Sequence, residues 1–281
     1  LTNGQLVVGS TGSPPRAATL TAGPGITISN SAGGISITAT SGGGASYDPV
    51  ILAKTSLLHY WPMSDAAGST TIADIKGSAP MTIADTLSNV ALGQLGPIND
   101  GTTALNFRGA ATKTDGIVKI PAAVIPAAGN YTIEFLFKNG GYLGPELPLT
   151  MVISFDNMDS LDLYIYGGGG GVPNTLRGNT AGVVDSYYTH VSTAPVANYH
   201  IALVANATAR TFTTYLNGTA LPISYTGAIG RQNGAGQLGS FGNPRASSPF
   251  AYRGVIQKLA IYGSALSASA IAAHYTASGL R

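Results

Sequence analysis

The sequence predicts an all-β protein: an antiparallel jelly-roll sandwich preceded by a short fibrous β stalk. Glycine (38 residues) and proline (16 residues) are abundant, which favours short strands joined by many turns. Only 9% of the residues are charged, whereas long surface helices need lysine and glutamate along their exposed side. An apolar content of 44% in 281 residues is sufficient for a large hydrophobic core. The composition therefore favours sheets over helices.

The distribution of charge argues against two classes of partner. The 14 basic and 12 acidic residues are scattered along the chain, so no basic stripe is present to bind nucleic acid. No apolar run approaches the length of about 18 residues that a membrane-spanning helix requires, so we expect no membrane insertion. Cysteine is absent, which excludes disulfides, thiolate metal sites and cysteine nucleophiles.

Residues 1–46 differ in kind from the rest and are expected to form the stalk, with a glycine-rich linker at residues 41–45. Short alternating runs are separated by Gly, Ser, Asn and Pro, and each is typical of a strand of four or five residues. The runs are residues 5–8, 18–21, 25–29 and 34–38. The last two resemble a hairpin with one apolar edge, which is marginal in water by itself. We expect three copies to wind around a common axis; a flexible linker is the alternative.

Residues 47–281 are expected to form the sandwich, because short strand-like runs alternate there with turn signals. The expected strands are residues 57–63, 104–107, 116–120, 131–138, 150–155, 161–166, 199–206, 211–216 and 255–262. Asn217-Gly218 supplies the residues that a tight hairpin turn prefers. One helix is expected at residues 267–276, where a serine precedes an alanine-rich run.

Five stretches of this second region, in order, resemble the laminin-G-like, concanavalin A-like jelly-roll family. They are residues 57–65, residues 104–109 with 115–121, residues 131–138, residues 199–204 with 214–219, and residues 254–262 with 265–275. The resemblance implies a two-sheet sandwich over about 230 residues. Folds of this kind serve both lectins and glycosidases, so the resemblance leaves the activity open.

The N-terminal residues 4–12 and 20–28 resemble repeats in the shafts of bacteriophage tail fibres. Such shafts are trimeric, and their tips commonly carry heads that bind a receptor. The resemblance implies a homotrimer at the tip of a virion tail fibre or spike, with a host cell-surface glycan as partner.

Catalysis is not expected. A glycosidase needs two carboxylates across a cleft, but the chain has only two glutamates, Glu134 and Glu146, and no acid lies two or four residues from Glu134 on its strand. Glu134 is better explained as a solvent-facing or hydrogen-bonded structural residue. Neither a Gly-x-Ser-x-Gly elbow nor an HExxH motif occurs.

The candidate ligand-binding residues are tyrosines with polar neighbours. Alternation in residues 161–166 places Asp162, Tyr164 and Tyr166 on the face opposite the apolar residues. Tyrosine rings beside a carboxylate suit sugar recognition, because rings cover C–H patches while polar groups bind hydroxyls. A second aromatic group follows a glycine-rich loop and consists of Tyr187, Tyr188 and His190. The alternative is that these tyrosines pack at strand edges or in a subunit interface.

The densest acidic cluster, at residues 156–162, could supply oxygen ligands to calcium. Asp156 and Asp159 are the candidate ligands, with Asp65 and Asp74 as weaker ones suggested by the family resemblance. Ordinary turn residues are the alternative explanation. No other cofactor is expected.

The leading hypothesis is thus a non-enzymatic receptor-binding tip of a phage or viral fibre that binds cell-surface carbohydrate. One alternative is a structural virion protein that caps or trimerises the fibre without a ligand. Another is a depolymerase that cuts surface polysaccharide, which the scarcity of glutamate disfavours.

Overall fold

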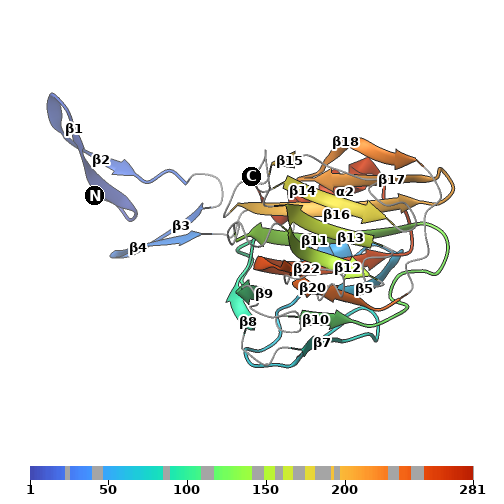
Figure 1. Cartoon of the computed structure of the whole chain (residues 1–281). Coiled ribbons are helices and arrows are strands. Elements are labelled where there is room, and N and C mark those ends of the chain that lie inside the picture. The colour runs from blue at the N-terminus through green and yellow to red at the C-terminus, as the bar shows by residue number, and fades with distance from the viewer. Residues whose placement is uncertain are drawn as a thin grey trace. The chain divides into compact units, whose positions relative to one another are not determined.

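The computed structural model describes residues 1–22, 26–39, 47–84, 89–108, 117–140, 149–155, 161–166, 175–180, 191–192, 197–226, 234–241 and 250–280 (Figure 1). The chain divides into two compact units, Leu1–Ala45 and Ser46–Arg281. The first is called the N-terminal unit below and the second the sandwich unit.

The N-terminal unit consists of two antiparallel hairpins. Strand β1 (Gln5–Ser10) pairs with β2 (Ser13–Thr19), and β3 (Ile26–Ser31) pairs with β4 (Gly34–Ala39). Gly4 alone is buried among the residues of this unit whose burial is described. Its exposed large apolar side chains are Leu1, Leu6, Val7, Val8, Leu20, Ile26 and Ile37. The described part of this unit therefore has no hydrophobic core of its own.

The sandwich unit contains two large antiparallel sheets, which confirms the predicted fold class. The first, called the β13 sheet, has the strand order β15 (Val191–Ser192), β14 (Thr175–Thr180), β13 (Leu161–Tyr166), β12 (Leu149–Phe155), β19 (Gly236–Leu238), β10 (Ile117–Ile120), β7 (Met81–Ala84) and β6 (Thr71–Ile72). A short hairpin of β20 (Ser240–Phe241) and β21 (Phe250–Ala251) follows β19.

The second, called the β11 sheet, has the order β18 (Thr219–Thr226), β17 (Thr211–Leu216), β16 (Asn198–Asn206), β11 (Tyr131–Asn139), β22 (Arg253–Tyr262), β9 (Thr103–Arg108) and β8 (Val90–Leu95). Strand β5 (Leu57–Trp61) also pairs with β22. Asn217 and Gly218 join β17 to β18 with φ angles of 50° and 76°, which confirms the tight turn expected there.

The core lies between the two sheets and takes residues from both. On β11, Ile133, Phe135 and Phe137 are fully buried in it, and Val118 and Leu163 of the β13 sheet belong to the same core. The lone tryptophan, Trp61, is fully buried in the same core and donates its Nε1–H to the carbonyl of Ala79 at 2.8 Å. Because side chains alternate along a strand, each strand that contributes to this core turns one of its two faces towards it.

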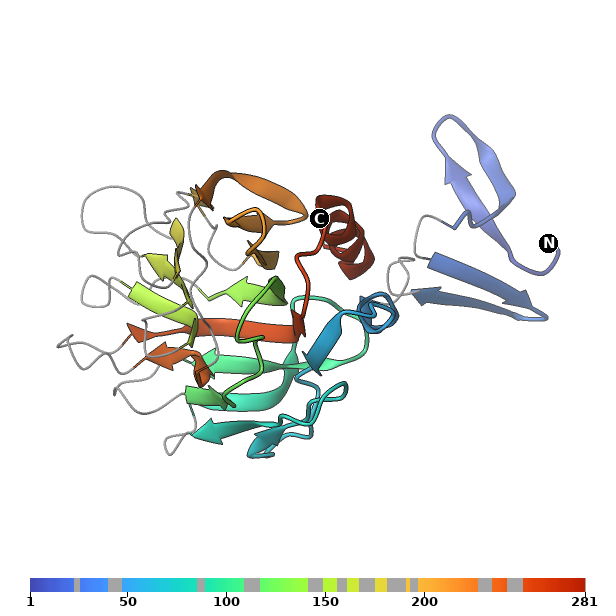
Figure 2. The same cartoon turned by 90° about the vertical axis from the view of Figure 1, so that its right-hand side faces the viewer.

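The other face of the β11 sheet is covered by two helices, so its central strands are buried on both sides. Helix α1 (Tyr47–Leu52) packs on Leu136 and Tyr262, and α2 (Ala268–Ser278) packs on Ala202 through Ile271. Figure 2 shows α2 in dark red beside the strands of this unit. Ser267 caps α2 by accepting a hydrogen bond from the amide of Ala270. The layer between the helices and the β11 sheet contains the buried charged residues Glu134 and Lys258.

Candidate functional site

The predicted ligand-binding strand is β13, and its register identifies the face on which the candidate residues lie. Leu163 is fully buried in the core. Because residues alternate along a strand, positions 162, 164 and 166 belong to the opposite, outer face of the β13 sheet. This placement agrees with the alternation seen in the sequence.

Strand pairing extends Asp162 into a polar row that crosses the β13 sheet. Consecutive partners in this row are Thr71, Thr82, Lys119, Gln237, Ser154, Asp162 and Asn179. The neighbouring row is Ile83, Val118, Leu238, Ile153, Leu163 and Gly178, in which Val118, Leu238, Ile153 and Leu163 are fully buried. Polar residue types thus occupy the positions on one face of the sheet, and core residues occupy those on the other.

The side chains described in the polar row differ in their exposure. Thr71, Thr82 and Lys119 are exposed, and Gln237 is half-buried. Ser154 is fully buried, and its Oγ has no hydrogen-bond partner in the described part of the chain. A buried hydroxyl without a partner is unusual, since such groups are normally satisfied. Among the described residues, the middle of the row therefore contains a hydroxyl without a partner, but its burial keeps it away from solvent.

A second row of outer-face positions runs beside the first. Tyr164 pairs with Arg177 of β14, and Tyr166 pairs with Thr175. Directly opposite residues in a sheet lie roughly 5 Å apart at their Cβ atoms, so a cation and an aromatic residue occupy adjacent positions. The outer face of β13 and β14 thus combines aromatic, acidic, basic and amide residues.

Sequence reasoning identified only part of this face. Lys119 could have been found, since it alternates with Val118 and Ile120 in an expected strand. Arg177 and Asn179 lie on β14, whose sequence Thr-Leu-Arg-Gly-Asn-Thr gave no strand signal. The remaining candidates lie outside the described residues: Tyr187, Tyr188 and His190 for the ligand, and Asp156 and Asp159 for calcium.

A different cluster surrounds Glu134, which lies in the buried layer beneath the helices. Its carboxylate is fully buried and accepts a 2.7 Å hydrogen bond from the Tyr47 hydroxyl. His200 Nε2 lies 2.9 Å from Oε1, and His274 Nδ1 lies 2.8 Å from Oε2. Burial acts to raise the pKa of Glu134, but hydrogen bonds and charge from the two histidines lower it well below its ordinary value. Glu134 is thus a hydrogen-bonded structural residue, one of the two roles expected for it.

A third cluster joins His59 to Asp74 with 2.6 Å between Nδ1 and Oδ2. Asp74 also accepts hydrogen bonds from the amides of Tyr60, Lys76, Gly77 and Ala79. Burial acts to raise the pKa of Asp74, but the hydrogen bonds from the His59 side chain and from the amides of Tyr60, Gly77 and Ala79 lower it below its ordinary value. Because both of its oxygens already accept hydrogen bonds within the protein, Asp74 is a poor candidate for a calcium ligand.

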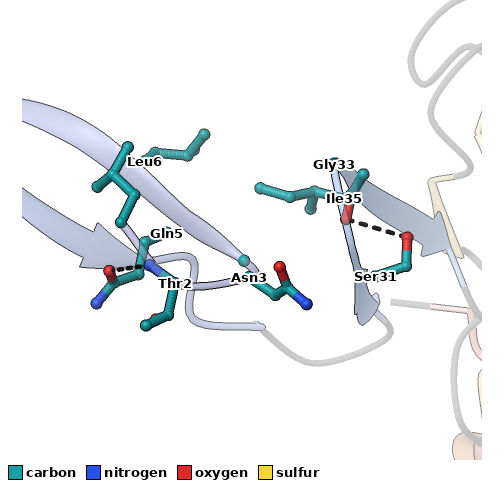
Figure 3. A pocket seen from close by; sticks show the side chains of 10 residues that line it. Thr2, Asn3, Gln5, Leu6, Ser31, Gly33 and Ile35 are labelled. Carbon is teal, nitrogen blue, oxygen red and sulfur yellow. Dashed lines mark hydrogen bonds between the residues drawn. The ribbon is translucent and has the colours of Figure 1, made fainter.

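A hollow in the N-terminal unit is lined by ten residues from β1, from the chain before it and from the β3–β4 hairpin (Figure 3). Gln5 Oε1 accepts a 2.9 Å hydrogen bond from the amide of Thr2 at one side of it. Its lining contains no acidic or basic side chain, so it offers no group for acid–base chemistry.

The described residues contain neither a metal-binding cluster nor a membrane-spanning helix. No three histidine, aspartate or glutamate side chains are arranged there to hold a metal ion. In the same residues, no helix is long and apolar enough to cross a membrane.

Comparison with known proteins supports the fold through structure alone. No protein-family model matches the sequence, and no curated protein matches it. Among solved structures, a Trypanosoma rangeli sialidase in complex with 2,3-difluorosialic acid is similar with a TM-score of 0.57 and 15% identity, covering 79% of this chain. The match covers 33% of the sialidase chain, so this chain spans about a third of its length.

Two smaller structures are similar over comparable parts of this chain. Domain 4 of AbnA, an extracellular arabinanase from Geobacillus stearothermophilus, in complex with arabinotriose, has a TM-score of 0.55 and 15% identity, covering 78% of this chain and 98% of that domain. The binding domain of botulinum neurotoxin DC, in complex with rat synaptotagmin II, has a TM-score of 0.56 and 14% identity, covering 79% of this chain and 51% of that one. At such identities the similarity establishes a β-sandwich.

Proposed function

We propose that this chain is a carbohydrate-binding head that acts by binding rather than catalysis, at the receptor-binding tip of a phage or viral fibre. The observation that carries the proposal is the polar row through Lys119, Gln237 and Asp162, with Tyr164 and Arg177 beside it. The laminin-G-like resemblance of the sandwich and the shaft-like sequence of the N-terminal unit supply the finer assignment to a fibre tip.

The residue types on this face suit a sugar chain. Lysine, glutamine, aspartate and asparagine bind hydroxyl, carboxylate and amide groups, while a tyrosine ring covers the apolar side of a pyranose. Lys119 and Asp162 are three strand spacings apart, roughly 14 Å, which matches a short oligosaccharide lying across the strands. The arabinotriose complex of AbnA domain 4 shows that a structurally similar sandwich can be combined with an oligosaccharide ligand.

Absence of catalysis is supported by the state of Glu134. It is fully buried and already bonded to Tyr47, His200 and His274, so it cannot reach a substrate without leaving those partners. Depolymerase activity would then depend on residues other than this glutamate.

The test is binding of the purified full chain to an array of bacterial surface polysaccharides and oligosaccharides, followed by titration calorimetry on the strongest ligand. We expect Lys119→Ala and Tyr164→Ala each to weaken binding about tenfold or more, as loss of about 1.4 kcal/mol would. Lys76→Ala is the matched control, because Lys76 is also an exposed lysine and lies in a loop outside the row. Unchanged binding by both Lys119→Ala and Tyr164→Ala would reject the site.

A second candidate is a structural role in which the chain trimerises or caps the fibre. The exposed apolar side chains of the N-terminal unit favour it, because they need a partner surface to leave water. This role predicts that the full chain assembles normally, binds no surface polysaccharide, and that the row variants leave adsorption to host cells unchanged.

A further inference from the structure

Lys258 is a buried lysine in an unusual backbone conformation. It lies on β22 at a break in the pairing with β11, and its φ angle is 61°, in the left-handed region that non-glycine residues seldom adopt. Among the lysines whose side chains are described, Lys258 alone is fully buried. The bulge directs this side chain into the layer beneath α1 rather than into solvent.

Two carboxylates meet the buried amine. Lys258 Nζ lies 2.9 Å from each oxygen of Asp48, so the amine contacts both oxygens of this carboxyl group. On another side, Nζ lies 3.0 Å from Oδ2 of Asp100. The exposed fractions of the side chains are 0% for Lys258, 25% for Asp48 and 17% for Asp100. Water therefore has little access to the amine.

The two carboxylates are held in different ways. Asp48 Oδ1 accepts a 2.5 Å hydrogen bond from the Tyr60 hydroxyl, and burial together with the charge of Asp48 raises the pKa of Tyr60, so this hydroxyl stays a donor. Asp100 accepts hydrogen bonds from the amide and the hydroxyl of Thr102. Burial acts to raise the pKa of Asp100, but those hydrogen bonds and Lys258 lower it. Asp100 is thus a stable acceptor, whereas the Asp48 carboxyl is polarised by a proton donor.

We propose that Lys258 and Asp48 condense to an intramolecular amide, with Asp100 as the base. Asp100 accepts a proton from the ammonium and passes it to the Asp48 carboxylate, so that the neutral amine attacks Cγ of a neutral carboxyl group. The Nζ–Cγ bond forms and one Cγ–O bond breaks. The released oxygen leaves as water with the two protons that Nζ loses, including the one held transiently by Asp100. An ammonium and a carboxylate thus become one amide and one water, with no oxidant or other reactant.

Two features of the fold favour this condensation over a permanent ion pair. The fold holds the reacting groups in contact, so the reaction avoids the entropy cost of bringing them together. This can raise the rate of condensation by many orders of magnitude. Condensation also removes the charge of the fully buried amine together with that of the half-buried Asp48, and desolvation of such charges is costly even when they are paired. The amide would connect residues 210 positions apart, joining the helix that begins the sandwich unit to its final strand.

The test is the intact mass of the purified full chain, measured after denaturation. We expect the mass to be lower than the sequence mass by one water molecule. Tryptic digestion should yield a branched peptide that joins the segment with Asp48 to the segment with Lys258. Because this readout uses the protein without substitutions, it does not depend on whether any variant folds.

Variants assign the loss of water to the proposed residues. Lys258→Arg keeps a buried cation but lacks the amine, and its mass should equal its own sequence mass. Asp100→Asn cannot accept the proton, and it should leave the unlinked form in excess. Lys138→Arg, at a half-buried lysine of β11, is the matched control and should retain the loss of water. Two results would overturn the proposal. One is that the chain without substitutions has its full sequence mass, and the other is that the loss of water persists in Lys258→Arg.

Discussion

Tyr47 and Glu134 are 87 residues apart in the sequence and are joined by a buried hydrogen bond of 2.7 Å. Tyr47 is the first residue of α1, and Glu134 lies in the middle of the central strand β11. The same carboxylate contacts His274 on α2 and His200 on β16. One glutamate therefore fastens both helices of the sandwich unit to its central sheet.

Tyr47→Phe should lower the free energy of unfolding by about 1.5–3 kcal/mol, because it removes a hydrogen bond to a buried charged group. Tyr131→Phe is the matched control: Tyr131 is equally buried, but its hydroxyl has no hydrogen-bond partner in the described part of the chain. That substitution should be neutral or slightly stabilising. Urea unfolding of both variants measures the difference, and equal losses would contradict the role given to Tyr47.

Glu134→Gln should cost about 3–5 kcal/mol near neutral pH, since it removes the central partner of a buried cluster. Its pKa in the folded protein is lowered, so the ionised carboxylate stabilises the fold above the ordinary glutamate pKa of about 4.3. That contribution is lost progressively as the pH falls below this value towards the pKa of the folded state. Unfolding free energies measured from pH 6 downward should therefore fall less steeply in the variant.

Asp65→Asn serves as the control for the loss of stability at low pH. Asp65 is half-buried and accepts only one hydrogen bond from the described residues, from the amide of Ala73. It should leave most of the pH dependence in place. If the unfolding free energy falls equally steeply with pH in Glu134→Gln and in the chain without substitutions, other carboxylates dominate the acid sensitivity.

Gly77→Ala should destabilise the sandwich unit by about 1–3 kcal/mol, the usual cost of overpacking. A Cβ at position 77 would collide with His59 Nδ1 and Asp74 Oδ2, which are in contact with one another. Gly9→Ala has open space around its added Cβ and is the control. Thermal unfolding, together with the NMR signal of the His59 ring, reports both the stability and the His59–Asp74 contact. A stable variant with an unchanged His59 signal would contradict this packing.

Much of the fold could be predicted, because several strands carry strong local patterns. Strands β13 and β17 have the expected bounds, and β11 differs by one residue, since alternating apolar residues define their core faces. Helix α1 was not expected, because its six residues contain a proline and show no helical period. Its position is fixed by tertiary contacts, chiefly the burial of Tyr47 and Ile51.

The candidate site was predictable only along a single strand. Asp162 and Tyr164 follow from alternation, whereas their neighbours Asn179 and Arg177 follow from register, which a single sequence does not reveal. The buried clusters depend on contacts at still longer range. His274 lies 140 residues from Glu134, and Lys258 lies 210 residues from Asp48. A lysine in a strand is ordinarily expected at the surface, so its burial could not have been inferred.

The N-terminal unit is expected to hold the chain in a trimer. In light scattering with mass determination, the full chain should have three times the chain mass of 28.4 kDa. Ile37 is 60% exposed and Val7 is 63% exposed, so replacing both with serine removes apolar surface that a trimer would bury. We expect the double variant to dissociate at concentrations where the unmodified chain remains assembled. Leu95→Ser is the control, because Leu95 is 87% exposed but belongs to the sandwich unit. A monomeric unmodified chain, or equal dissociation in the control, would refute assembly through the N-terminal unit.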